Sequence, residues 1–104
     1  MGTPEFAVPA LRHLISSSDH KIKAVFTRDP KAQGRGMKPT NSPIHDLALS
    51  YNIDVYTLKT LRNEEALKLI NSIRADIIIV VAYGFIIPKN ILTAKKYGCL
   101  NIHP

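Results

Sequence analysis

The sequence predicts an α/β domain built on a parallel sheet with helices on both faces. Segments that have the pattern of strands alternate with segments of helical periodicity, which is the order found in α/β folds. The run DIIIVVA at 76–82 shows no polar alternation, and such runs are typical of strands buried on both faces of a parallel sheet. With 104 residues and no repeat, low-complexity tract or linker, the chain is one small domain or a part of one.

A helix and a strand are expected first. Thr3 suits the N-cap of the helix and Pro4 its first position, because these residue types are favoured there. Apolar residues at helical spacing predict that the helix is amphipathic, and they are Ala7, Ala10, Leu11, Leu14 and Ile15. Residues 21–27 alternate and then become apolar, as a strand does.

A loop and a second helix follow. Residues 28–41 contain two Pro and two Gly and almost no apolar side chains, which predicts a loop. Ser42 suits the N-cap of a helix whose first position is Pro43. The apolar face of this helix is expected to comprise Ile44, Leu47, Ala48 and Tyr51.

The second half of the chain continues the alternation. Thr60 is expected to cap a helix that runs to about Arg74, with an apolar face made of Ala66, Leu69, Ile70 and Ile73. Gly98 suits the C-cap of a short later helix. The remaining expected elements are a strand at 54–58, the buried strand at 76–82, a turn at 83–88, that short helix at 89–96 and a last strand at 99–103.

Composition limits the classes of function. The apolar share of 45% is ordinary for a globular protein, and no apolar run approaches the roughly 20 residues of a membrane helix. The N-terminal segment has no basic stretch followed by an apolar one, so no secretory signal is expected. A single cysteine, Cys99, excludes an internal disulfide framework and a cysteine-rich zinc site. We therefore expect a reduced, cytoplasmic protein.

The chain carries a net charge of +6. Such a charge favours an anionic partner, either nucleic acid or a phosphorylated ligand. A basic surface that only maintains solubility accounts for it equally well, so charge alone leaves both interpretations open.

Four segments together resemble the methionyl-tRNA formyltransferase family. They are GTPEFAVPAL at 2–11, GRG at 34–36, VVAYGFIIP at 80–88 and GCLNIHP at 98–104. The resemblance implies a Rossmann-like catalytic domain that transfers a formyl group from 10-formyltetrahydrofolate to the α-amino group of methionine on initiator tRNA. It also implies a separate C-terminal barrel that helps to bind the tRNA.

The sequence departs from this family at both ends. The family normally has a first strand before GTPEF, of which Met1 would be the last residue. It also continues beyond NIHP with a catalytic aspartate, further folate contacts and the barrel. We therefore expect residues 1–104 to form a partial catalytic domain, incomplete at both ends, without the barrel and inactive on their own.

Two other functions stay open. The chain could act on a small amine, such as a glycinamide ribonucleotide or an amino sugar, or it could be a non-catalytic truncated remnant with weak RNA binding. The long basic segment 28–41 favours tRNA over a small amine.

Asn101 and His103 are the candidate catalytic residues. Residues i and i+2 of a strand point to the same face, so both side chains can meet one ligand. Formyl transfer develops negative charge on an oxygen, to which the Asn101 amide can donate a hydrogen bond. His103 can serve as a charged partner or a proton shuttle. The alternative is a strand-end Asn and a surface His without catalytic roles, which the spacing alone favours. The resemblance to the formyltransferases favours the catalytic roles.

The turn after the buried strand is the candidate folate site. The resemblance assigns Phe85, Ile86 and Ile87 to the folate pocket, and Tyr83 and Gly84 belong to the same turn. A glycine turn exposes backbone groups that suit a flat pterin ring, and apolar side chains can cover its faces. The alternative is a turn whose apolar residues only fill the core.

Two further sites are expected for the substrate. Lys31, Arg35 and Lys38 lie in the basic segment, where cationic side chains can contact phosphates, and the resemblance places Arg35 at the tRNA acceptor end. Gly2 and Thr3 at the first helix start could bind an anion or substrate backbone. The alternatives are a solvated charged loop and a simple capping turn. No metal is expected, because the histidines show no metal-ligand spacing.

Overall fold

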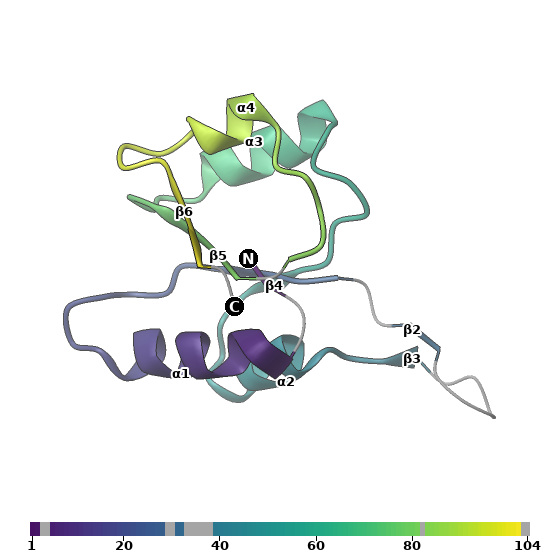
Figure 1. Ribbon diagram of the computed structural model, residues 1–104, viewed down its shortest axis with the longest axis vertical. Helices are drawn as coiled ribbons and strands as arrows, with labels where there is room; N and C mark the ends of the chain where they lie inside the picture. Colours follow the sequence, from purple (N-terminus) through teal and green to yellow (C-terminus); the bar gives the residue numbers. More distant parts are fainter. Residues whose placement is uncertain (3–4, 29–30, 33–38, 82, 103–104) are drawn as a thin grey trace.

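The computed structural model describes residues 1–2, 5–28, 31–32, 39–81 and 83–102. The helices are α1 (Val8–Ser16), which follows the 3-10 turn η1 (Glu5–Ala7), α2 (Pro43–Ser50), α3 (Glu64–Ser72) and α4 (Lys89–Leu92). The strands are β1 (Val25–Phe26), β2 (Lys31–Ala32), β3 (Pro39–Thr40), β4 (Val55–Tyr56), β5 (Ile78–Val81) and β6 (Cys99–Ile102). Helices α1 and α2 cover one side of the central strands and α3 and α4 the other (Figure 1). The predicted α/β architecture is therefore confirmed.

The central strands form two parallel pairs. Strand β1 pairs with β4, and β5 pairs with β6 over the register from Ile78–Cys99 to Val81–Ile102. Met1 and Gly2 lie between the pairs: the Val81 N–H donates to the Met1 carbonyl at 2.7 Å, and the Gly2 N–H donates to the Phe26 carbonyl at 3.0 Å. Gly2 also forms a parallel bridge with Val81. The spatial order is therefore β4, β1, Met1–Gly2, β5, β6, and Met1 occupies the position expected for the end of a first strand.

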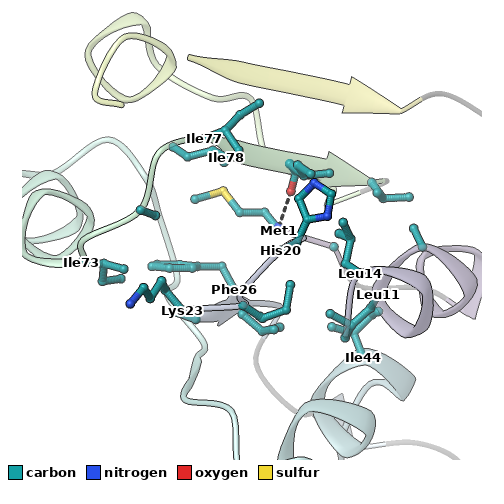
Figure 2. Close-up of a pocket in the computed structure, with 18 of the residues that line it drawn as sticks. Met1, Leu11, Leu14, His20, Lys23, Phe26, Ile44, Ile73, Ile77 and Ile78 are labelled. Atoms are coloured by element: carbon teal, nitrogen blue, oxygen red, sulfur yellow. Dashed lines mark hydrogen bonds between the residues drawn. The ribbon is translucent and has the colours of Figure 1, made fainter. Parts of the chain in front are cut away.

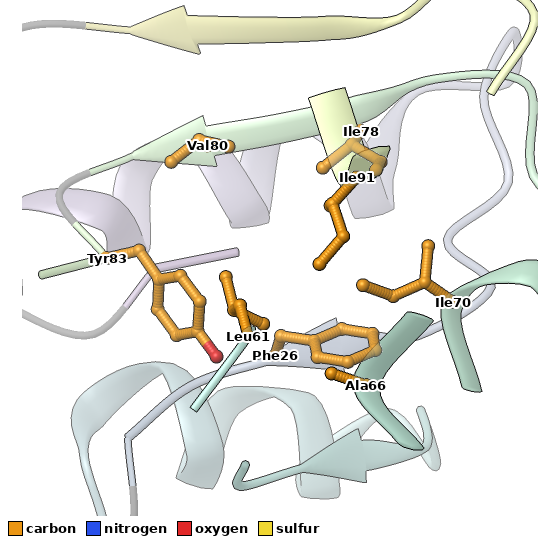
Figure 3. Packing of buried hydrophobic residues seen from close by; sticks show 8 residues of the cluster. All are labelled: Phe26, Leu61, Ala66, Ile70, Ile78, Val80, Tyr83 and Ile91. Carbon is orange, nitrogen blue, oxygen red and sulfur yellow. The ribbon is translucent and has the colours of Figure 1, made fainter. Parts of the chain in front are cut away.

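Two apolar cores lie on opposite faces of these strands. The core under α3 and α4 (Figure 3) comprises Phe26, Leu61, Ala66, Ile70, Ile78, Val80, Tyr83 and Ile91. The core under α1 and α2 comprises Ala7, Leu11, Val25, Ile44, Leu47, Ala48 and Val81. Because successive side chains of β5 alternate between the two cores, the prediction that this strand is buried on both faces is confirmed.

The structure confirms one predicted helix cap and replaces another. The Ser42 side chain accepts a hydrogen bond from the His45 N–H at 3.2 Å and caps α2. Helix α3 begins later than predicted, because Asn63 rather than Thr60 caps it by accepting from the Ala66 N–H at 2.9 Å. Thr60 instead accepts from the Arg62 N–H. The capping roles expected for Thr3 and Pro4 lie outside the described residues, and the described helix starts with η1.

Three other predictions were wrong in detail. The segment 28–41, expected to be a loop, contains the antiparallel strands β2 and β3, which pair Lys31 with Thr40. Helix α4 ends at Leu92, and Gly98, at φ +71°, closes a later turn by donating to the Lys95 carbonyl. Tyr51 follows α2 and is 53% exposed, because the helix ends before this residue can turn toward the core.

No helix among the described parts of the chain is long and apolar enough to cross a membrane.

Candidate functional site

The carboxyl ends of β5 and β6 meet at one edge of the sheet and border a cavity of about 390 Å³. All five residues of the candidate folate turn line this cavity, and so does Asn101. The other lining residues are Val80, Leu92, Cys99 and Ile102. In parallel α/β sheets, ligands bind outside the carboxyl ends of the strands. The structure therefore brings two separately predicted segments together where such a fold places its ligands.

Within the turn, the side chains differ in their surroundings. Tyr83 is 1% exposed and packs in the core under α3 and α4, and its ring makes an edge contact with Phe85 at 5.0 Å. Phe85 and Ile87 are half-buried against the same core. Ile86 is 77% exposed beside the cavity. Tyr83 thus anchors the turn as a core residue, while Ile86 presents apolar surface that the fold itself does not cover.

Gly84 gives the turn its conformation. Its φ of +91° is a left-handed value that side chains with a Cβ rarely adopt. A Cβ at this position would also lie only 2.8 Å from Cζ of Arg28. The positive φ explains why this turn needs glycine, and a side chain here would also require the flexible Arg28 guanidinium to move.

Arg28 contacts the turn from the neighbouring strand pair. Its Nη2 donates to the Gly84 carbonyl at 3.1 Å, and its Cζ lies 5.3 Å from the centre of the Phe85 ring. Arg28 was not expected from the sequence to be a residue of this site. Its position just beyond β1 was a usable signal, since the carboxyl ends of parallel strands meet at one edge.

Asn101 is exposed in β6, opposite Val80 of β5. Cys99 lies two residues earlier and also lines the cavity, as strand alternation requires. Burial raises the pKa of the Cys99 thiol, which favours its neutral form. His103 lies outside the described residues. None of the described residues lining this cavity is a carboxylate.

Gly2 is buried in the sheet, where its N–H is used by the Phe26 carbonyl. A Cβ on Gly2 would lie 2.6 Å from the Val81 carbonyl oxygen, so the close approach of strands accounts for this glycine. The neighbouring Thr3 of the candidate substrate-side turn lies outside the described residues. The Gly2 amide therefore contributes to the sheet in this structure.

A second cavity of about 180 Å³ adjoins Met1 between β1 and β5 (Figure 2). Its walls are mainly apolar and include Leu11, Phe26, Ile44 and Ile78. The Met1 ammonium donates to the Ile79 carbonyl at 2.6 Å, and burial lowers its pKa to about 6. This cavity is not at the carboxyl edge and contains none of the predicted catalytic or folate residues.

The basic segment is described only in part. Lys31 lies in β2, whereas Arg35 and Lys38 lie outside the described residues. Within the parts of the chain that the structure describes, no three His, Cys, Asp or Glu side chains gather as a metal site would require.

Comparison with known proteins gives a consistent result. Residues 1–104 match the family described as "Formyl transferase". The chain is 70% identical to methionyl-tRNA formyltransferase of Rickettsia bellii (strain RML369-C), 65% to that of Rickettsia rickettsii (strain Iowa) and 62% to that of Rickettsia canadensis (strain McKiel). Each alignment covers 100% of this chain and 34% of the relative. The chain thus spans about a third of the length of these relatives.

Proposed function

Since the chain belongs to the formyl transferase family, we propose that it forms part of the catalytic domain of a methionyl-tRNA formyltransferase. The whole enzyme would transfer a formyl group from 10-formyltetrahydrofolate to the α-amino group of methionine on initiator tRNA, in the cytoplasm. The observation that carries this proposal is the cavity shared by the turn 83–87 and Asn101. The segments that the relatives have in addition would supply the C-terminal barrel and the remaining groups of the site.

The residues of the cavity fit a folate. The exposed Ile86 side chain offers apolar surface to one face of a flat ring, and Phe85 and Ile87 lie in the same wall. Exposed Gly84 leaves the main chain of the turn accessible, and main-chain donors and acceptors suit the edge of a pterin. The bound folate would supply the formyl group.

Asn101 would act on the charge that develops during transfer. Attack of the methionine amine on the formyl carbon places negative charge on the formyl oxygen, and the Asn101 side-chain N–H would donate to it. His103, two residues further on, would assist as a charged partner or move the proton released by the amine. No metal has a part in this proposal.

The tRNA would contact the basic segment. Lys31, Arg35 and Lys38 would pair with phosphates near the acceptor end, because such contacts supply much of the sequence-independent affinity for nucleic acid. The net charge of +6 agrees with binding to an anionic macromolecule.

The test replaces the matching segment of the Rickettsia bellii enzyme with these 104 residues. We expect this full-length chimera to formylate methionyl initiator tRNA. Asn101→Ala should lower kcat by roughly 10²–10³-fold, the usual cost of removing an oxyanion donor. The control is Asn71→Ala on the exposed face of α3, which should leave the rate unchanged.

Two outcomes would overturn the proposal. One is a chimera that formylates only small amines, with glycinamide ribonucleotide and an amino sugar as the probes. The other is equal activity of the Asn101→Ala and Asn71→Ala chimeras. The 104 residues alone should show no turnover, and turnover abolished by His103→Ala would contradict that expectation.

A further inference from the structure

Arg28 links the two halves of the sheet at the edge that holds the candidate site. It follows β1 by two residues, whereas the carbonyl to which its Nη2 donates at 3.1 Å belongs to Gly84, 56 residues further along the chain. No strand pairing joins β1 directly to β5, since Met1–Gly2 lie between them. The Arg28 side chain therefore spans the central position of the sheet and reaches the turn beyond it.

The guanidinium also lies against an aromatic ring of that turn. Cζ is 5.3 Å from the centre of Phe85, a distance at which a cation is attracted to the ring. Phe85 in turn makes its edge contact with the buried Tyr83 ring at 90°. The Phe85 ring is thus held between a core aromatic and the charged end of Arg28.

Gly84 makes this approach possible. A Cβ at this position would be 2.8 Å from both Cζ and Nε of Arg28, so any side chain there would displace the guanidinium. The backbone conformation of the turn and the position of Arg28 therefore depend on each other.

We propose that Arg28 is a positioning residue for the formyl donor, which fixes the Gly84 carbonyl and the Phe85 ring in the wall of the cavity. This inference rests on the proposed function, because the donor is assigned to that cavity. Arg28 does not line the cavity, so it acts through the turn and not by direct contact. Without it, the turn would have to be ordered when the donor binds, which weakens binding but leaves the bound reaction geometry unchanged.

The kinetic test uses the full-length chimera with Arg28→Gln. We expect the KM for 10-formyltetrahydrofolate to rise about 5- to 30-fold, which is only part of what a charged hydrogen bond and a cation–ring contact contribute, because Arg28 acts on the donor through the turn. At saturating donor, kcat should stay within about threefold of the value for the unmodified chimera. The KM for tRNA should not change. Arg28→Lys retains the cation and should recover part of the donor KM. Arg62→Gln, at an exposed site beyond β4, is the control.

A structural test separates failure of this inference from failure of the proposed function. Amide hydrogen exchange at residues 84–87 should become faster in Arg28→Gln than in Arg62→Gln, with or without catalysis. Unchanged exchange there overturns the positioning role whatever the chimera catalyses. A KM that rises for tRNA alone, or Arg28→Gln kinetics equal to the control, also overturns it. An unmodified chimera that does not use the donor overturns the proposed function, and the exchange result still decides the role of Arg28.

Discussion

The Val81 N–H donates a 2.7 Å hydrogen bond to the carbonyl of Met1, and this bond joins the first residue of the chain to the strand that leads into the candidate site. Gly2 completes the connection by donating to Phe26 on the other side. Two residues thus hold the β1–β4 pair and the β5–β6 pair in one parallel order. Changes at Met1 or Gly2 should affect the whole sheet.

In a polypeptide made of these 104 residues alone, the amine of Met1 should make stability depend on pH. Burial lowers its pKa from 8.0 to about 6, so between these values the unfolded chain binds more protons than the folded chain. The free energy of unfolding should therefore rise with pH from about 6 to 8, by roughly 2–3 kcal/mol for a shift of this size. Urea unfolding of the 104-residue chain at several pH values measures this.

The control for this prediction is the same chain acetylated at Met1. Acetylation removes the titrating group, so the rise between pH 6 and 8 should disappear. Cys99 titrates above this window, because burial raises its pKa. An identical pH profile for the free and acetylated chains would contradict the prediction.

Gly2→Ala should destabilise the protein. The new Cβ would lie 2.6 Å from the Val81 carbonyl oxygen and 3.0 Å from Cβ of Ala7, so the strands must separate, at a typical cost of about 1–3 kcal/mol. Amide exchange at Gly2 and Val81 should accelerate. Gly98→Ala is the comparison, because its cost arises from φ +71° and a Cβ there would lie 3.5 Å from its nearest neighbour, the Leu92 carbonyl oxygen. If exchange at Gly2 and Val81 accelerates equally in both variants, the predicted local effect is absent.

Ser42→Ala should remove two hydrogen bonds. The Ser42 hydroxyl caps α2 and also lies 2.7 Å from Oγ1 of the fully buried Thr27. Loss of an N-cap costs about 0.5–2 kcal/mol, and the Thr27 hydroxyl loses this partner as well. Thermal unfolding should show a lower Tm than in Ser72→Ala, whose exposed hydroxyl only donates back to Leu69 within α3. Equal Tm values for the two variants would contradict the role of Ser42.

Ile86→Asp should weaken donor binding without loss of stability. The side chain is 77% exposed beside the cavity, so a carboxylate there is hydrated in the free protein. When the folate binds, this carboxylate would lose its water to the folate ring, which costs free energy. We expect the KM of the chimera for 10-formyltetrahydrofolate to rise about tenfold or more at unchanged Tm. Leu49→Asp in α2, also exposed and remote from the cavity, is the matched control. Equal KM values for Ile86→Asp and Leu49→Asp would show that Ile86 does not contact the donor.

Much of the fold was accessible from the sequence because apolar patterns correspond to burial. The run at 76–82 lacks polar residues since β5 faces a core on each side. Helix starts were less certain where two capping residues are close together. Thr60 and Asn63 both suit an N-cap, and the choice depends on Leu61, which is 2% exposed and enters the core before the helix begins. That contact is tertiary and leaves no local signal.

The candidate site was accessible in part. The family resemblance, together with strand alternation and the glycine turn, pointed to Asn101 and residues 83–87, and the structure places them around one cavity. Their catalytic and folate-binding roles stay predictions. The position of Arg28 just beyond β1 was a usable signal, but Arg28 was missed because a side chain that reaches from one strand end to another adds no periodic pattern to the sequence.

The pairing of Met1 has a consequence for synthesis on the ribosome. The nitrogen of Met1 donates to the Ile79 carbonyl, 78 residues later in the chain, so Met1 is synthesised long before its partner in β5. Helices α1 and α2 are synthesised early, whereas the centre of the sheet must wait for β5 to emerge. Until then Phe26 and the apolar residues around it remain exposed to other nascent chains and to chaperones. The order of translation therefore allows the centre of this sheet to close only after β5 has been synthesised.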